Sequence, residues 1–330
     1  MNKKIRFFNK YNRKNLLTAL SRNGSFFLLA ALLILSQILT GGLFFTYDNL
    51  NSIVRQIAVT AIISVGFTVL MASGGIDLSV SSMLSLLGCI YAVCALNLPM
   101  WISIFVAVIC GAACGFLNGC ITELFELPAF IITLAMSQVY KGLAYLLTDG
   151  ASIGGLPSWV TFAGQGIVFG FIPFSLILLL AISLAISFMM NRTQFGRFII
   201  ASGGNPESAR SSGINVTRIK TCAYMIAGIT TAIAAIVLTG RVSIALPGAG
   251  DGMETDVIAA VVIGGTPITG GRSRIFGTLC GCFIIGVLGN LMNITGVPSF
   301  WQWVFKGAII VIAVVSGSNF SKRVLARKFK

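Results

Sequence analysis

Apolar stretches of about 20 residues follow one another along most of this chain of 330 residues. A helix needs about 20 mostly apolar residues to cross roughly 30 Å of hydrocarbon, so each stretch is long enough to span a bilayer. Hydrophobic residues make up 56% of the sequence and charged residues only 10%, which leaves too little polar surface to cover a water-soluble globule. The pattern predicts an all-α integral membrane protein, a polytopic bundle of about ten transmembrane helices.

The eighth predicted span is the shortest. It runs into Gly264-Gly265-Thr266-Pro267 and has the length of a broken or re-entrant helix, which is tolerated where backbone is buried in protein or lines a cavity. The predicted spans are Ser25 to Leu43, Val54 to Ala72, Val80 to Leu96, Met100 to Thr122, Ala129 to Leu147, Ile167 to Met190, Cys222 to Gly240, Thr255 to Gly265, Ile275 to Asn293 and Phe300 to Ser316.

Lysine and arginine residues orient these spans. They concentrate before the first span, in the polar segment 191–220 and at the end of the chain, as expected of cytoplasmic segments. Six spans before the polar segment and four after it place both termini in the cytoplasm. The chain then divides into a basic cytoplasmic N-terminal segment (1–24), a transmembrane domain (25–317) that includes the cytoplasmic loop 191–220, and a basic cytoplasmic tail (318–330). This topology accounts for the net charge of +14, and no nucleic-acid-binding motif accompanies it.

The polar segment contains one very short predicted helix. Asn205 suits the N-cap and Pro206 the first helical position. Glu207 complements the positive end of the helix dipole, and Gly213 suits the left-handed residue after the helix. A helix of about seven residues is shorter than the roughly 12 that are marginal alone in water, so we expect docking to stabilise it. In a membrane protein, such a segment indicates a contact for a cytoplasmic partner.

Glycine residues recur at two kinds of position. Gly111, Gly115 and Gly119 lie four apart in the fourth span, as do Gly277 and Gly281 in the ninth. Small residues at this spacing let helix backbones approach closely, and we expect packing within the chain, with contact between two copies as the alternative.

Two glycine-rich motifs lie at predicted inner span ends. Gly74-Gly75-Ile76-Asp77-Leu78-Ser79 separates the second and third spans, and residues 264–271 separate the eighth and ninth. The parallel suggests a duplicated hairpin without proving a repeat. Asp77 suits an N-cap of the third span, accepting N–H groups two or three residues on, with a gating or coupling role as the alternative.

The sequence offers no recognisable catalytic or metal-binding chemistry. It has no histidine, no G-x-S-x-G or H-E-x-x-H motif, and no Gly-Lys dipeptide that a phosphate-binding loop would need. The eight cysteines lie in or at the ends of predicted spans, where they are typical of small packing residues. Intramembrane charges are few, since Lys141 and Lys306 lie near outer span ends and Arg55 begins the second span. The sequence therefore predicts no enzyme, no metal site, no cofactor and no ion-coupled relay.

Four motifs stand in a fixed order between roughly residues 50 and 315. They are Gly-Gly-Ile-Asp-Leu-Ser at 74–79, Pro-Ala-Phe-Ile-Ile-Thr-Leu at 128–134, Phe-Gly-Arg at 195–197 with Gly-Gly-Asn at 203–205 and Ser-Gly-Ile at 212–214, and Asp-Val-Ile-Ala-Ala-Val-Val-Ile-Gly-Gly-Thr at 256–266. Together they resemble the ribose/galactose-type permease subunit of bacterial ABC sugar importers. Two departures are local: Val80-Ser81-Ser82 replaces the usual Val-Gly-Ser, and Pro267-Ile268-Thr269 stands where Ser-Leu-Ser or similar is common.

The resemblance implies a division of labour in the bacterial cytoplasmic (inner) membrane. An extracytoplasmic binding protein delivers a monosaccharide, two permease subunits, identical or paralogous, form the path, and two cytoplasmic ATPases drive alternating access. The match to the family's coupling segment implies that the ATPase is contacted by Gly203, Gly204, Asn205, Pro206, Glu207, Ala209, Arg210 and Gly213.

Other candidate residues follow from what a neutral sugar needs, which is a weakly binding, hydroxyl-tolerant path. Each set carries an alternative: hydrogen bonding between helices for the path residues, and solvation with placement at a helix N-terminus for the acidic group. The candidates are Asn118, Thr133, Ser137 and Gln138 for the path, Asp251, Glu254 and Asp256 for contact with the binding protein, and Gly74, Gly75, Asp77, Ser79, Gly264 and Gly265 for gating or a structural role.

Three classes of function remain at this point. An importer permease requires a separate ATPase, an ion-driven secondary carrier works alone, and a membrane-embedded enzyme would need an acid–base constellation that the sequence lacks. Within the first class, permeases for nucleosides or branched-chain amino acids are alternatives, because substrate choice resides largely in the binding protein.

Overall fold

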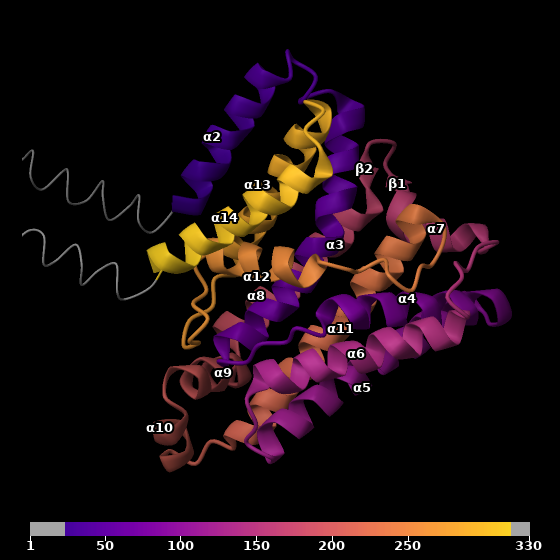
Figure 1. Ribbon diagram of the computed structural model, residues 1–330. Coiled ribbons are helices and arrows are strands. Elements are labelled where there is room, and N and C mark those ends of the chain that lie inside the picture. The colour runs from indigo at the N-terminus through magenta and orange to yellow at the C-terminus, as the bar shows by residue number, and fades with distance from the viewer. Residues whose placement is uncertain (1–23, 318–330) are drawn as a thin grey trace, which may run out of the picture.

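The computed structural model describes residues 24–317, which fold into helices α2 to α14 and one two-stranded hairpin (Figure 1). Apart from Gly24, the predicted N-terminal segment (1–24) and the predicted tail (318–330) lie outside this range. The elements are α2 (Gly24–Leu39), α3 (Tyr47–Ala72), α4 (Val80–Asn97), α5 (Met100–Leu124), α6 (Ala129–Thr148), α7 (Ser158–Gln165), β1 (Ile167–Val168), β2 (Ile172–Pro173), α8 (Phe174–Arg192), α9 (Gln194–Gly204), α10 (Pro206–Ser211), α11 (Val216–Val242), α12 (Met253–Ile263), α13 (Ile275–Ile294) and α14 (Ser299–Gly317).

Seven helices in the described range are long and apolar enough to cross a membrane: α3, α4, α5, α6, α8, α11 and α13. Three further apolar helices occupy the other predicted windows, of which α2 has 16 residues, α12 has 11 and α14 has 19. The prediction of an all-α membrane protein is thus confirmed as a mostly helical chain with seven candidate spans.

Three predicted span starts are wrong, those of α3, α8 and α11, and α11 begins at Val216 rather than Cys222. The sequence predicts helix from Ile167, but β1 and β2 pair antiparallel there and α8 begins only at Phe174. Phe169 and Gly170 form the turn with φ of 53° and 78°, which a right-handed helix excludes. The second predicted span starts too late, since α3 begins at Tyr47 in a polar first turn that the hydropathy pattern did not reveal.

Helices α3, α4 and α11 form the buried centre of the molecule. Helix α11 packs against α3, α4, α5 and α7, and most residues of all three central helices are buried. Helices α5, α6 and α8 leave a large part of their apolar surface exposed, as expected of helices that meet lipid or another subunit.

Both glycine ridges pack within the chain, as predicted. Those of α5 face α11: a Cβ at Gly111 would lie 2.6 Å from the carbonyl oxygen of Gly228, and one at Gly115 would overlap the carbonyl of Tyr224. On α13, Cβ atoms at Gly277 and Gly281 would meet the backbone of α12. Any larger side chain would push these helix pairs apart.

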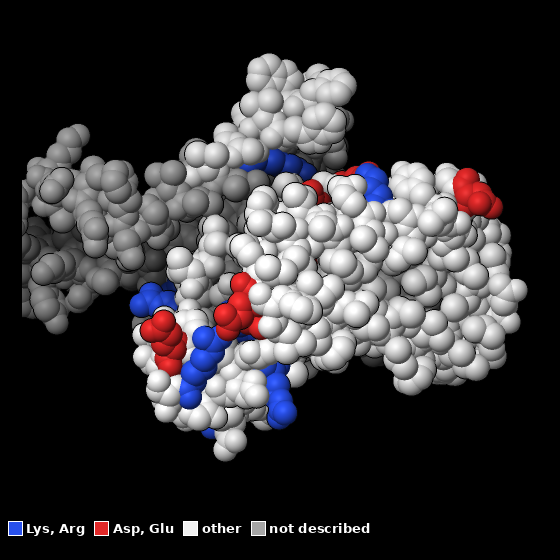
Figure 2. All heavy atoms as spheres, turned by 60° about the horizontal axis from the view of Figure 1, so that its bottom comes forward, with Lys and Arg blue, Asp and Glu red and all other residues white. Residues whose placement is uncertain are grey.

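The two ends of the molecule carry different elements. Helices α9 and α10 lie at the lower left of Figure 1, while α7 and the β1–β2 hairpin lie at the upper right. On the face drawn in Figure 2, charged side chains gather in a few clusters and most of the surface is uncharged. Such a charge distribution is typical of a protein whose middle lies in lipid.

Candidate coupling and translocation sites

The short helix predicted in the polar segment is present as α10. Asn205 caps it, because its Oδ1 accepts a hydrogen bond from the Ser208 N–H at 2.9 Å, and Pro206 occupies the first turn. Gly213 has φ of 82° just after the helix, so the predicted left-handed position is confirmed. Glu207 and Arg210 point into solvent, whereas Ala209 is buried.

The sequence interpretation missed the helix that precedes α10. Helix α9 begins after Thr193, whose Oγ1 accepts a hydrogen bond from the Gly196 N–H at 3.3 Å. It buries Ile199 completely, and Gly203 and Gly204 form its last turn rather than a loop. Phe195, Phe198 and Ile199 have the spacing of one helix face, so the signal for α9 was present but was overlooked in a segment interpreted as polar throughout.

Two ion pairs lie near α10: one joins α10 to the turn between α5 and α6, and the other joins the start of α11 to the end of α5. Arg210 Nη2 lies 3.8 Å from Glu126 Oε1, with both side chains exposed. Lys220 Nζ lies 3.4 Å from Glu123 Oε1, and this pair is mostly buried. Because burial reduces screening by water, the second pair is the firmer of the two connections.

Three glycine-containing segments meet backbone to backbone beside the end of α9. A Cβ on Gly203 would overlap the Ala72 carbonyl oxygen and lie 2.8 Å from the Gly271 nitrogen. Gly271 donates its N–H to the same Ala72 carbonyl at 2.9 Å. Gly270 completes the contact, since its Cβ would lie 2.8 Å from the Gly74 nitrogen. We call Ala72–Gly74, Gly203–Gly204 and Gly270–Gly271 the glycine junction.

Asp77 lies fully buried in the loop between α3 and α4. Its Oδ1 accepts hydrogen bonds from the N–H and the hydroxyl of Ser79, at 2.8 and 2.6 Å, and its Oδ2 accepts one from Asn118 Nδ2 at 3.0 Å. The predicted acceptance of an N–H two residues on is confirmed, but Ser79 holds the N-cap position of α4. Burial raises the pKa of Asp77, although the three donors oppose that shift.

The hydrogen-bond network around Asp77 joins one loop and two helices. Asn118 of α5 also donates to Ser79 Oγ at 2.8 Å and accepts from the hydroxyl of Tyr140 on α6 at 2.9 Å. Every one of these side chains is buried, so the network joins the α3–α4 loop, α5 and α6 in a water-poor interior.

The four residues predicted for the path lie in different surroundings. Asn118 belongs to the Asp77 network, and Thr133 is buried with its hydroxyl on the Ala129 carbonyl at 2.8 Å. Ser137 Oγ lies 2.8 Å from Ser82 Oγ of α4, and Gln138 is exposed on α6. Asn118 and Ser137 make the hydrogen bonds between helices that the alternative interpretation expects, whereas Thr133 bonds within α6, and the place of all four on a path stays a prediction.

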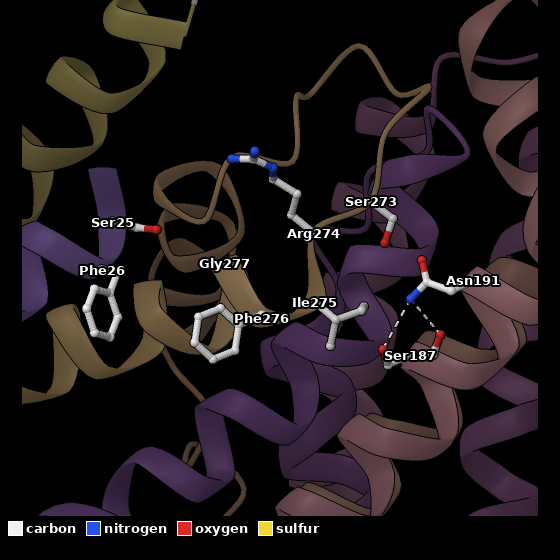
Figure 3. A pocket seen from close by; sticks show the side chains of 9 residues that line it. All are labelled: Ser25, Phe26, Ser187, Asn191, Ser273, Arg274, Ile275, Phe276 and Gly277. Carbon is white, nitrogen blue, oxygen red and sulfur yellow. Dashed lines mark hydrogen bonds between the residues drawn. The ribbon is translucent and has the colours of Figure 1, made fainter. Parts of the chain in front are cut away.

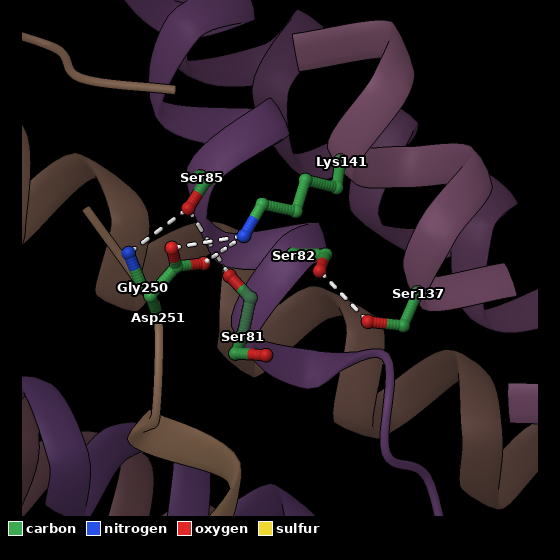
Figure 4. Close-up of polar contacts among 7 residues, drawn as sticks. All are labelled: Ser81, Ser82, Ser85, Ser137, Lys141, Gly250 and Asp251. Carbon is green, nitrogen blue, oxygen red and sulfur yellow. Dashed lines mark hydrogen bonds and ion pairs between the residues drawn. The ribbon is translucent and has the colours of Figure 1, made fainter. Parts of the chain in front are cut away.

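A polar seam follows α4 opposite α6 and the loop before α12 (Figure 4). Ser85 Oγ accepts the Gly250 N–H at 2.9 Å, and the Lys141 ammonium binds both oxygens of Asp251 at 3.0 and 2.9 Å. Sequence reasoning noted Ser82 only as a departure from the family motif and proposed neither Ser82 nor Ser85 as a contact residue, although the run of serines in the third span was a visible signal. It placed Lys141 near the outer span end but did not find its partner.

The outer acidic group does not act as one cluster. Asp251 pairs with Lys141 and is half exposed, whereas Asp256 pairs with Lys306 Nζ at 2.8 Å and is mostly buried. Glu254 Oε2 is buried without a hydrogen-bond partner. Of the three, Asp251 therefore offers the most accessible carboxylate, although it is already paired.

A cavity of about 510 Å³ opens between the start of α2, the end of α8 and the start of α13 (Figure 3). Its lining combines phenylalanine rings with serine hydroxyls and the Asn191 amide, while the Arg274 side chain extends away from Ser187 and Asn191. None of the predicted path or coupling residues lines it. Among the described residues, no group of three cysteine, aspartate or glutamate side chains could hold a metal ion.

Comparison with known proteins gives consistent matches along nearly the whole chain. Residues 49–314 match the family described as branched-chain amino acid transport system / permease component. The ribose import permease protein RbsC of Escherichia coli (strain K12) is 37% identical over 281 residues, which cover 82% of this chain and 86% of that protein. RbsC of Bacillus subtilis (strain 168) is 40% identical over 270 residues, covering 81% and 84%.

A further relative carries a different name. The xylose transport system permease protein XylH of Escherichia coli (strain K12) is 34% identical over an alignment of 346 residues, covering 86% of this chain and 88% of that protein. No solved structure gave a significant match. On the family match and these full-length relatives, the chain belongs to the permease-component family of the branched-chain amino acid transport system type.

Proposed function

We propose that this chain is the transmembrane permease subunit of an ATP-binding-cassette importer for a monosaccharide, a ribose-like pentose or a hexose. The observation that carries the proposal is the similarity to ribose import permeases, at 37–40% identity over more than four-fifths of both chains. The seven candidate spans support a multi-pass protein of the bacterial inner membrane.

A sugar is favoured over the other substrates that the sequence left open. The relatives at 34–40% identity are named for ribose and xylose, whereas the broader family description names branched-chain amino acids. The described helices also carry few charges, which suits a neutral solute. A branched-chain amino acid is the second candidate only because the family description names it.

The proposed partners follow from the assignment of this chain as the permease component of an importer. Cytoplasmic ATPase subunits supply the energy, an extracytoplasmic binding protein supplies the solute, and a second permease, identical or paralogous, completes the path. The chain itself is not an enzyme in this scheme. Large exposed apolar areas on α5 and α6 support a role for lipid or a second subunit as their cover.

We further propose ten crossings with both termini in the cytoplasm. Support comes from α2, α12 and α14, which are apolar and fill the three windows beyond the seven longest spans. The start of α2, the end of α14 and the pair α9–α10 all lie at the left of Figure 1. Broken or short helices such as α12 are tolerated where protein surrounds them.

Within this scheme α10 is the contact with the ATPase. Its exposed residues Glu207 and Arg210 stand on a two-turn helix whose Asn205 cap and Gly213 end are both in place. The exposed Arg210–Glu126 pair joins α10 to the α5–α6 turn, and the mostly buried Lys220–Glu123 pair joins the following helix, α11, to α5. The path residues Thr133, Ser137 and Gln138, and the outer acidic residues, remain candidates for contact with solute and with the binding protein.

Reconstitution tests this function directly. The chain is purified in mild detergent with its co-eluting ATPase, placed in proteoliposomes with ATP on the ATPase side, and given binding protein with radiolabelled ribose, xylose, galactose, leucine or adenosine. We expect uphill uptake of a sugar that depends on both ATP and the binding protein.

Vesicles containing this chain alone provide the control. Uphill accumulation by the chain alone, collapsed by an ionophore, would contradict the proposal and support an ion-driven carrier. Uptake of leucine without sugar would move the assignment to the second candidate.

A further inference from the structure

The glycine junction connects the coupling segment to two loops that are far away in sequence. Gly203 lies in the last turn of α9, directly before the Asn205 cap of α10. One neighbour is the end of α3 with its following loop, Ala72–Gly74, and the other is Gly270–Gly271, in the loop between α12 and α13. Both loops belong to the glycine-rich motifs that separate pairs of apolar helices.

No side chain stands between these three segments. The Gly203 Cα hydrogen faces the Ala72 carbonyl, and Gly271 donates to that carbonyl at 2.9 Å, so the Ala72 oxygen is shared by both neighbours. Backbone in direct contact cannot absorb a displacement by rotamer changes, whereas long side chains can. The exposed Arg210–Glu126 pair is a connection of the flexible kind, with both side chains more than half exposed.

We infer that Gly203 is a positioning residue through which a displacement of α10 reaches the α3–α4 and α12–α13 loops together. The inference rests on the proposed function, because it requires that an ATPase moves α10. The α3–α4 loop carries Asp77, whose network reaches α5 and α6, and the α12–α13 loop leads into α13. The contact at Gly203 thus connects the part of the transmembrane domain that precedes α9 with the part that follows it.

A glycine outside the junction gives the control variant. A Cβ at Gly203 would overlap the Ala72 carbonyl, whereas a Cβ at Gly307 of α14 would meet nothing within 4 Å. Both residues lie in helices, so Gly203→Ala and Gly307→Ala have similar effects on helix propensity. Only the first forces the junction apart.

The measurement is the number of solute molecules imported per ATP hydrolysed, in the reconstituted and fully assembled complex. We expect G203A to lower this ratio about tenfold or more while ATP hydrolysis continues, and G307A to leave it unchanged. A defect in folding or assembly alone would lower import and hydrolysis in proportion and would not change the ratio. An unchanged ratio in assembled G203A overturns the inference.

A second measurement on the wild-type complex covers the case in which G203A does not assemble. Hydrogen exchange is compared between the nucleotide-free and ATP-trapped states for peptides covering residues 70–76, 203–212 and 268–273. We expect all three to change together. A change in 203–212 without the other two overturns the inference, whereas a wild-type complex that imports no sugar at all contradicts the proposed function instead.

Discussion

At the scale of single residues, the fully buried Asp77 makes stability depend on pH. Burial raises its pKa above 3.8, so the folded chain holds this proton more tightly than the unfolded chain. Where the folded state binds more protons, stability falls as pH rises, and the loss continues until pH passes the raised pKa. Above that pH the buried carboxylate is ionised, which lowers the stability of the fold. Its three hydrogen-bond donors offset part of this loss.

The variant Asp77→Asn tests this dependence. It keeps the shape and the acceptor for Ser79 but cannot ionise, and its amide faces Asn118 Nδ2, which adds a penalty that does not change with pH. We expect the thermal midpoint of the wild type, measured relative to D77N in detergent, to fall as the pH rises above 3.8. Parallel curves for the two proteins would mean that Asp77 does not titrate in that range.

The two lysine–aspartate pairs differ in burial and should differ in energetic value. Lys306 and Asp256 are 29% and 18% exposed, against 39% and 54% for Lys141 and Asp251. Lys306→Gln leaves a mostly buried carboxylate without its cation, and we expect a loss of about 2–4 kcal/mol in unfolding free energy. Lys141→Gln should cost less than about 1 kcal/mol. Chemical denaturation of both variants measures the difference, and equal losses would contradict this ranking.

At the scale of helices, two glycines on neighbouring helices differ in the space that they leave for a side chain. A Cβ on Gly115 of α5 would overlap the Tyr224 carbonyl of α11, whereas one on Gly142 of α6 meets nothing within 4 Å. We expect Gly115→Ala to destabilise the protein by about 1–3 kcal/mol or more. Gly142→Ala should be neutral or stabilise it by up to about 1 kcal/mol through helix propensity. Thermal unfolding monitored by size-exclusion chromatography compares the two, and a stable G115A would exclude the close α5–α11 packing.

The sequence predicted helix ends where the signal is local. The order Asn205, Pro206, Glu207 and Gly213 identifies α10 because each residue acts on backbone within a few positions. The α9 helix escaped prediction because its short apolar face lies in a segment interpreted as polar, and β1–β2 because two residues with positive φ interrupt an otherwise helical pattern. The glycine ridge on α5 was predictable from its spacing, and its partner α11 was not.

In the candidate site, too, local features were predictable from the sequence and contacts between distant residues were not. Asp77 and Asn118 both stood out as polar residues near or within apolar segments, but nothing in the sequence pairs residues separated by 41 positions. The glycine junction is less accessible still, because it joins backbone atoms of three distant segments and leaves no side-chain pattern. Tertiary contacts of this kind depend on helix crossing positions, which single-sequence patterns do not specify.

At the scale of the whole molecule, the proposed topology predicts opposite accessibility for two exposed serines. Ser208 lies on α10, and Ser152 lies in the loop between α6 and α7. In a cysteine-free background, we expect Ser152→Cys to react with a membrane-impermeant maleimide in intact spheroplasts and Ser208→Cys to react only after lysis. Reaction of S208C from outside would reverse the orientation and remove the basis for an ATPase contact at α10.

The loops at the end opposite α9 and α10 are tied into one unit. Ile153 and Ala245 exchange both backbone hydrogen bonds, at 2.9 and 3.0 Å, and so join the segment after α6 to the segment after α11. The Gly250 N–H on Ser85 adds α4 to the same unit. A binding partner that displaces one of these segments therefore displaces the others. This end of the protein moves as one rigid unit rather than as independent loops.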